Sequence, residues 1–189
     1  KFNTADSPKL PISYSNYFDG TGDYLSTAVS TSTPGWNLMA PSGSGGGSIE
    51  AWIYVNSATS RIICGCLNIG ASYTGWHLSI SATGQLAING YIAGNNVPPA
   101  INSGAGLVAL NTWTHIAVSC VSGVVTFYIN GVAYNSANPI GSTWQINNTA
   151  TATMVGDAYT PWNTPFLGYI SNLRMVNNTA VYTGAGLTV

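Results

Sequence analysis

The feature that most constrains the fold is an alternation of side chains over residues 113–134. From Trp113 onward every second residue falls on the same face, which is typical of a β-strand and not of a helix. Residues 121–123 supply a turn, and a second alternating run follows over residues 124–129. Asn130 and Gly131 then predict a type I′ turn, because both tolerate the positive φ angles that this turn requires. The pattern therefore predicts three consecutive antiparallel strands.

Further strands are predicted on both sides of this meander. Residues 48–55 alternate, with Ile49 and Ile53 on one face and Trp52 and Tyr54 on the other. A strand with apolar residues on both faces is expected near the centre of its sheet. Other strands are expected at residues 61–65, 75–80, 85–88 and 166–176, a first hairpin at residues 14–25, and long loops at residues 30–47, 91–105 and 137–153. No helix of length is predicted.

The charge content is unusually low. Charged residues make up 5% of the chain, against roughly 25% in a typical soluble domain. With a formal net charge of −1, such a surface cannot hold a polyanion by releasing counterions, so nucleic acid is disfavoured as a partner. Two compatible explanations remain: a neutral ligand, or burial of the surface against other subunits, where charged residues are depleted. The composition therefore favours a homo-oligomer, a neutral partner, or both.

The length of the chain suits one domain. All-β sandwiches reach 189 residues undivided, and residues 16–189 are predicted to form a single domain. Residues 1–15 contain Pro8 and Pro11 and no sustained pattern, so we predict an extended N-terminal arm. No apolar run approaches the roughly 20 residues that a membrane-crossing helix needs, so no membrane insertion is expected.

Catalytic chemistry is poorly represented. Glu50 is the only glutamate, whereas glycoside hydrolysis needs two carboxylates across the scissile bond. Asp19 and Asp23 lie in one glycine-rich loop, which favours turn formation. His77 follows Trp76 and His115 lies near Trp113, each in a predicted strand, where a hydrogen-bonded structural role is expected. The chain is therefore predicted not to be an enzyme.

The remaining reactive groups have structural interpretations. Arg174 is predicted to form an ion pair with Glu50 or Asp157, because a lone buried charge is costly. The cysteines are odd in number, which argues against a disulfide scaffold, and we predict buried free thiols. They are Cys64, Cys66 and Cys120. The predicted core tryptophans are Trp52, Trp76 and Trp113.

Four segments resemble the concanavalin A-like, laminin G-like sandwich domains. They are Tyr-Phe-Asp-Gly-Thr-Gly-Asp-Tyr-Leu at residues 17–25, Trp-x-His-Ile-Ala-Val at 113–118, Phe-Tyr-Ile-Asn-Gly at 127–131 and Gly-Tyr-Ile-Ser-Asn-Leu-Arg at 168–174. The resemblance implies an all-β, jelly-roll β-sandwich of two antiparallel sheets. The last segment, with Ala-Val-Tyr-Thr at 180–183, resembles modules of phage tail and virion proteins. It therefore implies an extracellular location on a virion surface, in a tail fibre, spike or capsid decoration.

The same resemblance implies a candidate calcium site. Domains of this kind often hold Ca²⁺ at the rim of the sandwich with one or two acidic side chains and backbone carbonyls. The candidate ligands are Asp19, Asp23 and Asp157. Ser171 and Asn172 stand where relatives often have acidic residues, which departs from the pattern. No cofactor is required.

Glycan binding is predicted at three loops. It needs aromatic rings for the apolar faces of sugars, and amides or hydroxyls for their edges. The candidate residues are Trp144, Asn147, Tyr159, Trp162, Asn163, Asn95 and Asn96. The alternative is that Trp144 and Trp162 close the ends of the core or contact another subunit.

These observations predict a virion surface module that attaches to host-surface glycan and packs against other virion subunits. Two alternatives remain open. One is a purely structural, oligomeric virion protein without a ligand, and the other is a secreted or cell-surface lectin.

Overall fold

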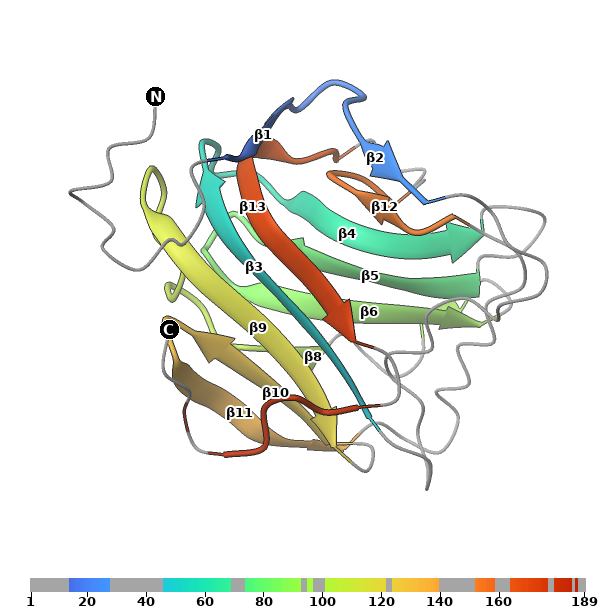
Figure 1. The fold of residues 1–189 in the computed structure, drawn as a ribbon, viewed down its shortest axis with the longest axis vertical. Coiled ribbons are helices and arrows are strands. Elements are labelled where there is room, and N and C mark those ends of the chain that lie inside the picture. Colours follow the sequence, from blue (N-terminus) through green and yellow to red (C-terminus); the bar gives the residue numbers. More distant parts are fainter. Residues whose placement is uncertain are drawn as a thin grey trace.

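The computed structural model describes residues 14–27, 46–68, 74–92, 95–96, 101–121, 124–139, 152–158, 164–176, 179–184 and 186. Over these residues the chain forms strands and no helix, in two antiparallel sheets that enclose one core (Figure 1). The predicted all-β sandwich is confirmed. No helix in the described ranges is long and apolar enough to span a membrane. Most of the predicted N-terminal arm, residues 1–13, lies outside them.

The six-stranded sheet, here sheet A, has the order β1-β13-β3-β9-β10-β11. Its strands are β1 (Asn16–Asp19), β3 (Gly47–Val55), β9 (Trp113–Val121), β10 (Val124–Ile129), β11 (Val132–Pro139) and β13 (Leu167–Val176). Strands β9 to β11 are the predicted meander. Asn130 and Gly131 have φ angles of 48° and 84°, as a type I′ turn requires. Strand β3 lies between β13 and β9, which confirms its predicted central position.

The seven-stranded sheet, here sheet B, has the order β2-β12-β4-β5-β6-β7, and β8 also pairs with β6. Its strands are β2 (Leu25–Ser26), β4 (Arg61–Asn68), β5 (Thr74–Ile80), β6 (Leu86–Ile92), β7 (Asn95–Asn96), β8 (Ile101–Asn102) and β12 (Met154–Val155). The predicted meander of β4, β5 and β6 is confirmed. The loop predicted at residues 91–105 is partly wrong, because β6 extends to Ile92 and its edge pairs with the short strands β7 and β8.

The hairpin predicted at residues 14–25 does not form. Strand β1 pairs with β13 in sheet A, whereas β2 pairs with β12 in sheet B. Residues 20–24 therefore carry the chain from one layer of the sandwich to the other. Gly20 and Gly22 have φ angles of 81° and 94°, which only glycine adopts readily. The turn chemistry was predicted correctly, but the two flanking strands have different partners.

The core lies between the inner faces of the two sheets. Ile49, Ile53 and Val55 of β3 are at most 1% exposed, and Trp76 of β5 is fully buried. The cysteines are buried and free, as predicted: Cys64, Cys66 and Cys120. Burial raises the pKa of the Cys64 thiol, which keeps it protonated.

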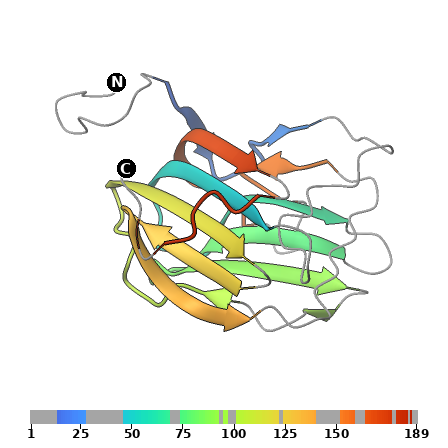
Figure 2. The same ribbon diagram turned by 60° about the horizontal axis from the view of Figure 1, so that its bottom comes forward.

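Two of the predicted core tryptophans lie elsewhere. Trp52 and Trp113 are only partly buried, because strand alternation puts them on the face opposite to Ile49 and Ile116. That face is the outer face of sheet A. Part of it is crossed by a C-terminal segment, here residues 179–184 and 186, drawn in dark red in Figures 1 and 2. Trp76 alone of the three was assigned correctly.

Candidate functional site

The C-terminal segment is fastened to the outer face of sheet A by contacts with three strands. The Val181 amide donates a hydrogen bond of 2.8 Å to Ser48 Oγ of β3. The Tyr128 hydroxyl of β10 donates one of 2.9 Å to the Gly184 carbonyl. Gly186 forms a β-bridge with Val132 of β11. The segment therefore covers one half of this face.

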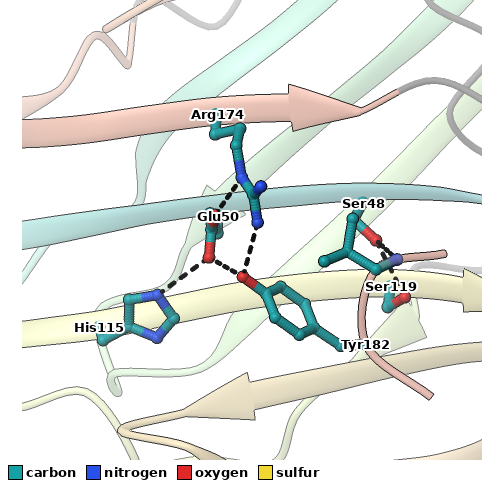
Figure 3. Close-up of polar contacts among 7 residues, drawn as sticks. Ser48, Glu50, His115, Ser119, Arg174 and Tyr182 are labelled. Atoms are coloured by element: carbon teal, nitrogen blue, oxygen red, sulfur yellow. Dashed lines mark hydrogen bonds and ion pairs between the residues drawn. The ribbon is translucent and has the colours of Figure 1, made fainter. Parts of the chain in front are cut away.

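Beneath the segment lies a polar cluster around Glu50 (Figure 3). The carboxylate accepts hydrogen bonds from Arg174 Nε and from the Tyr182 hydroxyl, and it lies 3.4 Å from His115 Nε2. Arg174 Nη2 also donates to the Tyr182 hydroxyl over 3.1 Å. The predicted ion pair between Glu50 and Arg174 is confirmed. With several partners, the partly buried carboxylate is well compensated.

His115 in this cluster is held as a neutral imidazole. Burial lowers its pKa, and the neighbouring Glu50 carboxylate raises it by a smaller amount. Its buried Nδ1 has no hydrogen-bond partner within the described part of the chain, whereas Nε2 faces the Glu50 carboxylate, so the ring proton belongs on Nε2. The cluster in Figure 3 contains one carboxylate, whereas glycoside hydrolysis needs two. Its geometry serves to fasten the chain.

A different, uncharged cluster lies on the outer face of sheet B. Gly65, His77 and Asn89 occupy one cross-strand row of β4, β5 and β6. The Asn89 amide nitrogen lies 3.1 Å from His77 Nε2 and 3.5 Å from Ser79 Oγ. The His77 ring stacks on Tyr91 at a centroid distance of 5.7 Å. Burial lowers the pKa of His77 to about 4, so this group, here called the polar strip (His77, Ser79, Asn89 and Tyr91), is neutral near pH 7.

Two described segments border the polar strip. Asn95 and Asn96 form β7, and Asn96 pairs with Tyr91. On the other side, a Cβ built on Gly65 would lie 2.7 Å from the Cβ atoms of both Ala158 and His77. The absent side chain of Gly65 therefore lets Ala158 lie over the outer face of sheet B.

The other predicted glycan residues cannot be placed. Five lie outside the described residues: Trp144, Asn147, Tyr159, Trp162 and Asn163. For Asn95 and Asn96 the backbone is described and the side chains are not. The assignment of these residues to a glycan site stays a prediction.

The candidate calcium ligands hydrogen-bond to nearby main chain. Asp19 Oδ1 accepts from the amide and hydroxyl of Thr21, each at 2.7 Å, which lowers the pKa of Asp19. Asp23 Oδ2 accepts from the Asp19 amide, and Asp157 Oδ1 from the Ala158 amide. Across the described ranges, no group of three or more His, Cys, Asp or Glu side chains is arranged to hold a metal. Calcium therefore stays a prediction that relies on backbone carbonyls.

Sequence reasoning missed the polar strip as a candidate site. The signal was present, since His77 and Ser79 are two residues apart in one strand, as are Asn89 and Tyr91 in the next. What the sequence lacked was the register that sets His77 opposite Asn89. Only that pairing joins two strand patterns into one neutral cluster, in which His77 and Tyr91 are buried and Ser79 and Asn89 are partly exposed.

The described residues form a two-sheet antiparallel sandwich with an uncharged polar cluster on the outer side of sheet B. The chain belongs to the concanavalin A-like lectin/glucanases superfamily, since a laminin G-type model of that superfamily matches residues 19–181. The predicted family is confirmed. No curated protein matches the sequence.

Several solved structures share the fold. Domain 4 of AbnA, a GH43 extracellular arabinanase from Geobacillus stearothermophilus in complex with arabinotriose, is 16% identical with a TM-score of 0.58, over 88% of this chain and 72% of that one. The Ruminococcus gnavus IT-sialidase CBM40 bound to alpha2,3 sialyllactose is 13% identical with a TM-score of 0.57, over 85% and 92%. This chain also matches 25% of the length of Trypanosoma rangeli sialidase, at 15% identity and a TM-score of 0.60 over 88% of its own length. At these identities the likeness shows the fold alone.

Proposed function

We propose that this chain is a non-catalytic carbohydrate-binding module that holds a neutral glycan on the outer face of sheet B. The observation that carries the proposal is the polar strip, which is uncharged and lies between β7 and the chain that passes Ala158. These two borders are also where sequence patterns predicted glycan-binding loops. The strip and the predicted loop residues together offer amides, a hydroxyl and aromatic rings, which is the chemistry that sugars require.

The groups in the polar strip favour a ligand without charge. Asn89 and Ser79 offer hydrogen bonds without charge, and His77 stays unprotonated near pH 7 because burial lowers its pKa to about 4. The strip contains no cationic side chain that would pair with an acidic sugar. Two sandwiches of this fold, the arabinanase domain and the sialidase module, are bound to saccharides in their solved structures, which supports a saccharide as the ligand class.

A non-catalytic role is supported by the position and state of the acidic groups. Glu50 lies on sheet A, on the opposite side of the sandwich from the polar strip. Its oxygens are already occupied by Arg174 and Tyr182. A carboxylate committed in this way neither protonates a leaving group nor activates water.

The finer role we propose is attachment to host glycan from a virion surface, with other virion subunits or further copies of this chain as neighbours. The motifs at residues 168–174 and 180–183, which resemble those of phage tail modules, support it. A secreted or cell-surface lectin is the second candidate, supported by the superfamily match and independent of any virion.

Substitution in the polar strip tests the site. Asn89→Ala should weaken binding to a neutral glycan, found on an array and measured by calorimetry, by about tenfold, since a buried partner loses its hydrogen bond. Thr126→Ala on sheet A is the matched control and should leave the dissociation constant unchanged. Trp162→Ala tests the adjoining predicted loop. Equal affinities of wild type and Asn89→Ala, or no binding to any neutral glycan, would contradict the proposal.

A further inference from the structure

The half of sheet A's outer face that the C-terminal segment leaves uncovered carries a row of aromatic side chains. The strand registers pair Tyr17 with Tyr169, Tyr169 with Tyr54, and Tyr54 with Trp113. The ring centroids are 4.9, 5.9 and 5.7 Å apart along this order. The row, here called the aromatic ladder, therefore crosses β1, β13, β3 and β9 in a continuous line.

The ladder is accessible to solvent. Tyr17 is 52% exposed and Tyr169 is 37% exposed, while Tyr54 and Trp113 are partly buried. The solvent side of an antiparallel sheet is ordinarily polar. Contiguous aromatic surface on such a face marks a site of interaction, because the rings would otherwise be packed inside.

The geometry of the rings limits what they can hold. Successive rings are inclined at 49°, 81° and 57°, so they do not form the flat platform that a crystalline surface would need. The row spans three inter-strand spacings of about 4.8 Å, roughly 14 Å in all. A narrow line of differently tilted faces suits one extended, flexible chain that presents apolar faces in turn.

Polar groups border one long side of the ladder. Asn56 follows β3 and Asn111 precedes β9, and the Asn56 amide donates to Asn111 Oδ1 over 3.1 Å. Both amides are exposed. Asp19 lies two residues beyond Tyr17 on β1, so its carboxylate is on the same side of the sheet. The border offers hydrogen bonds to hydroxyl groups and repels anions.

We propose that the aromatic ladder is a second saccharide-binding surface, on the opposite face of the sandwich from the polar strip, and that its ligand is a single neutral saccharide chain. The rings stack on apolar sugar faces, and Asn56 and Asn111 bond the hydroxyl edges. The Asp19 carboxylate disfavours acidic chains. This surface is separate from the proposed site on sheet B, and the two proposals can be tested independently.

A saccharide fits this surface better than a second copy of the chain. Three of the four rings end in a phenolic hydroxyl, which stays hydrogen-bonded to water or to a sugar but needs a matched partner in a dry protein interface. The amide and carboxylate border would also have to be desolvated by a protein partner. A sugar chain supplies hydroxyl groups along its whole length.

Affinity electrophoresis of the whole chain tests the ladder. The gels contain laminarin, xylan, galactomannan or hydroxyethylcellulose as neutral probes, and polygalacturonate as the acidic one. At least one neutral probe should retard the wild type, and polygalacturonate should not. Tyr169→Ala should weaken that binding about three- to tenfold, the effect of one lost stacking partner, while Tyr169→Phe retains it. Tyr17→Ala, at the more exposed ring, should act in the same direction.

The controls separate this surface from the polar strip and from folding. Thermal unfolding should show that Tyr169→Ala is folded, and Asn89→Ala should leave retardation by the ladder's probe unchanged. The proposal is overturned if no neutral probe binds, if polygalacturonate binds as well as the neutral probes, or if Asn89→Ala abolishes binding that Tyr169→Ala leaves intact. It is also overturned if Tyr169→Ala converts a dimer into a monomer without changing retardation, because the occupant is then a second copy.

Discussion

The two outer faces of the sandwich each bury a histidine, and they surround it differently. His77 on sheet B is 6% exposed and accepts a hydrogen bond from the Asn89 amide. His115 on sheet A is 4% exposed and faces the Glu50 carboxylate. Burial lowers the pKa of both rings, but only His115 has an anion that opposes the shift. The polar strip of sheet B is therefore neutral, whereas His115 of sheet A lies beside a carboxylate that interacts with the C-terminal segment.

The outer face of sheet A also has two halves that differ in charge and in aromatic content. Glu50 and Arg174 lie in the half that the C-terminal segment crosses, while the exposed rings of Tyr17 and Tyr169 lie in the other half. A chain with 5% charged residues thus leaves hydroxyl, amide and aromatic groups for recognition.

The largest expected effect is the pH dependence that His77 contributes to stability. In the unfolded chain its ring protonates near pH 6.5, whereas burial holds its pKa at about 4 in the folded chain. Above pH 6.5 the ring is neutral in both states and does not lower the free energy of unfolding. As the pH decreases toward 4, the unfolded state takes up the proton first, and the free energy of unfolding falls by roughly 3 kcal/mol. Urea unfolding of wild type and His77→Gln at several pH values measures the difference. A difference that does not change with pH would contradict a neutral strip.

Removing the Glu50 carboxylate should have the next largest effect. Glu50→Ala leaves Arg174 and Tyr182 without their acceptor and should lower the free energy of unfolding by about 2 kcal/mol. The Arg174 side chain is 52% exposed, so Arg174→Ala should cost less than about 1 kcal/mol. Chemical denaturation compares the two. If both variants lose the same stability, the cluster is an ordinary surface ion pair and the contrast between the faces weakens.

A smaller, local effect is expected where the C-terminal segment joins β3. Ser48→Ala removes the acceptor of the Val181 amide and the contact of 3.1 Å with Ser119 Oγ. The loss should be about 1 kcal/mol, and hydrogen exchange at Val181 should accelerate. Exchange at Ile116 in the core beneath should stay slow. Unchanged exchange at Val181 would mean that the other contacts of the segment, through Tyr182, Gly184 and Gly186, are enough to hold it.

Local patterns predicted the parts of this fold that depend on neighbours in sequence. Asn130 and Gly131 determine their own turn, and alternation assigned the two faces of β3. The hairpin at residues 14–25 failed because turn chemistry in the linker does not specify which strand pairs with β1. Its partner, β13, lies about 150 residues further along the chain, and nothing within residues 14–25 encodes that pairing.

The candidate sites were harder to predict for the same reason. Alternation shows that Trp113 and Ile116 lie on opposite faces but does not say which face is inside, so Trp113 was assigned to the core. The polar strip and the aromatic ladder both depend on register, which joins residues such as His77 and Asn89 across strands. The ion pair of Glu50 and Arg174 could be predicted because the chain offers few other charges.

The smallest expected effect is a change in the pKa of His115, which tests whether the two outer faces are electrostatically separate. Glu50→Gln removes the negative charge that raises this pKa and leaves the burial that lowers it, so the pKa should move further below 6.5. The two ring signals can be followed by NMR titration, with His77 as the internal control because burial, and no neighbouring charge, lowers its pKa. A pKa of His115 that rises in the variant, or a parallel change at His77, would show that the two faces are not electrostatically separate. A decrease in pKa that is confined to His115 would show that the charge of Glu50 affects only the histidine on sheet A.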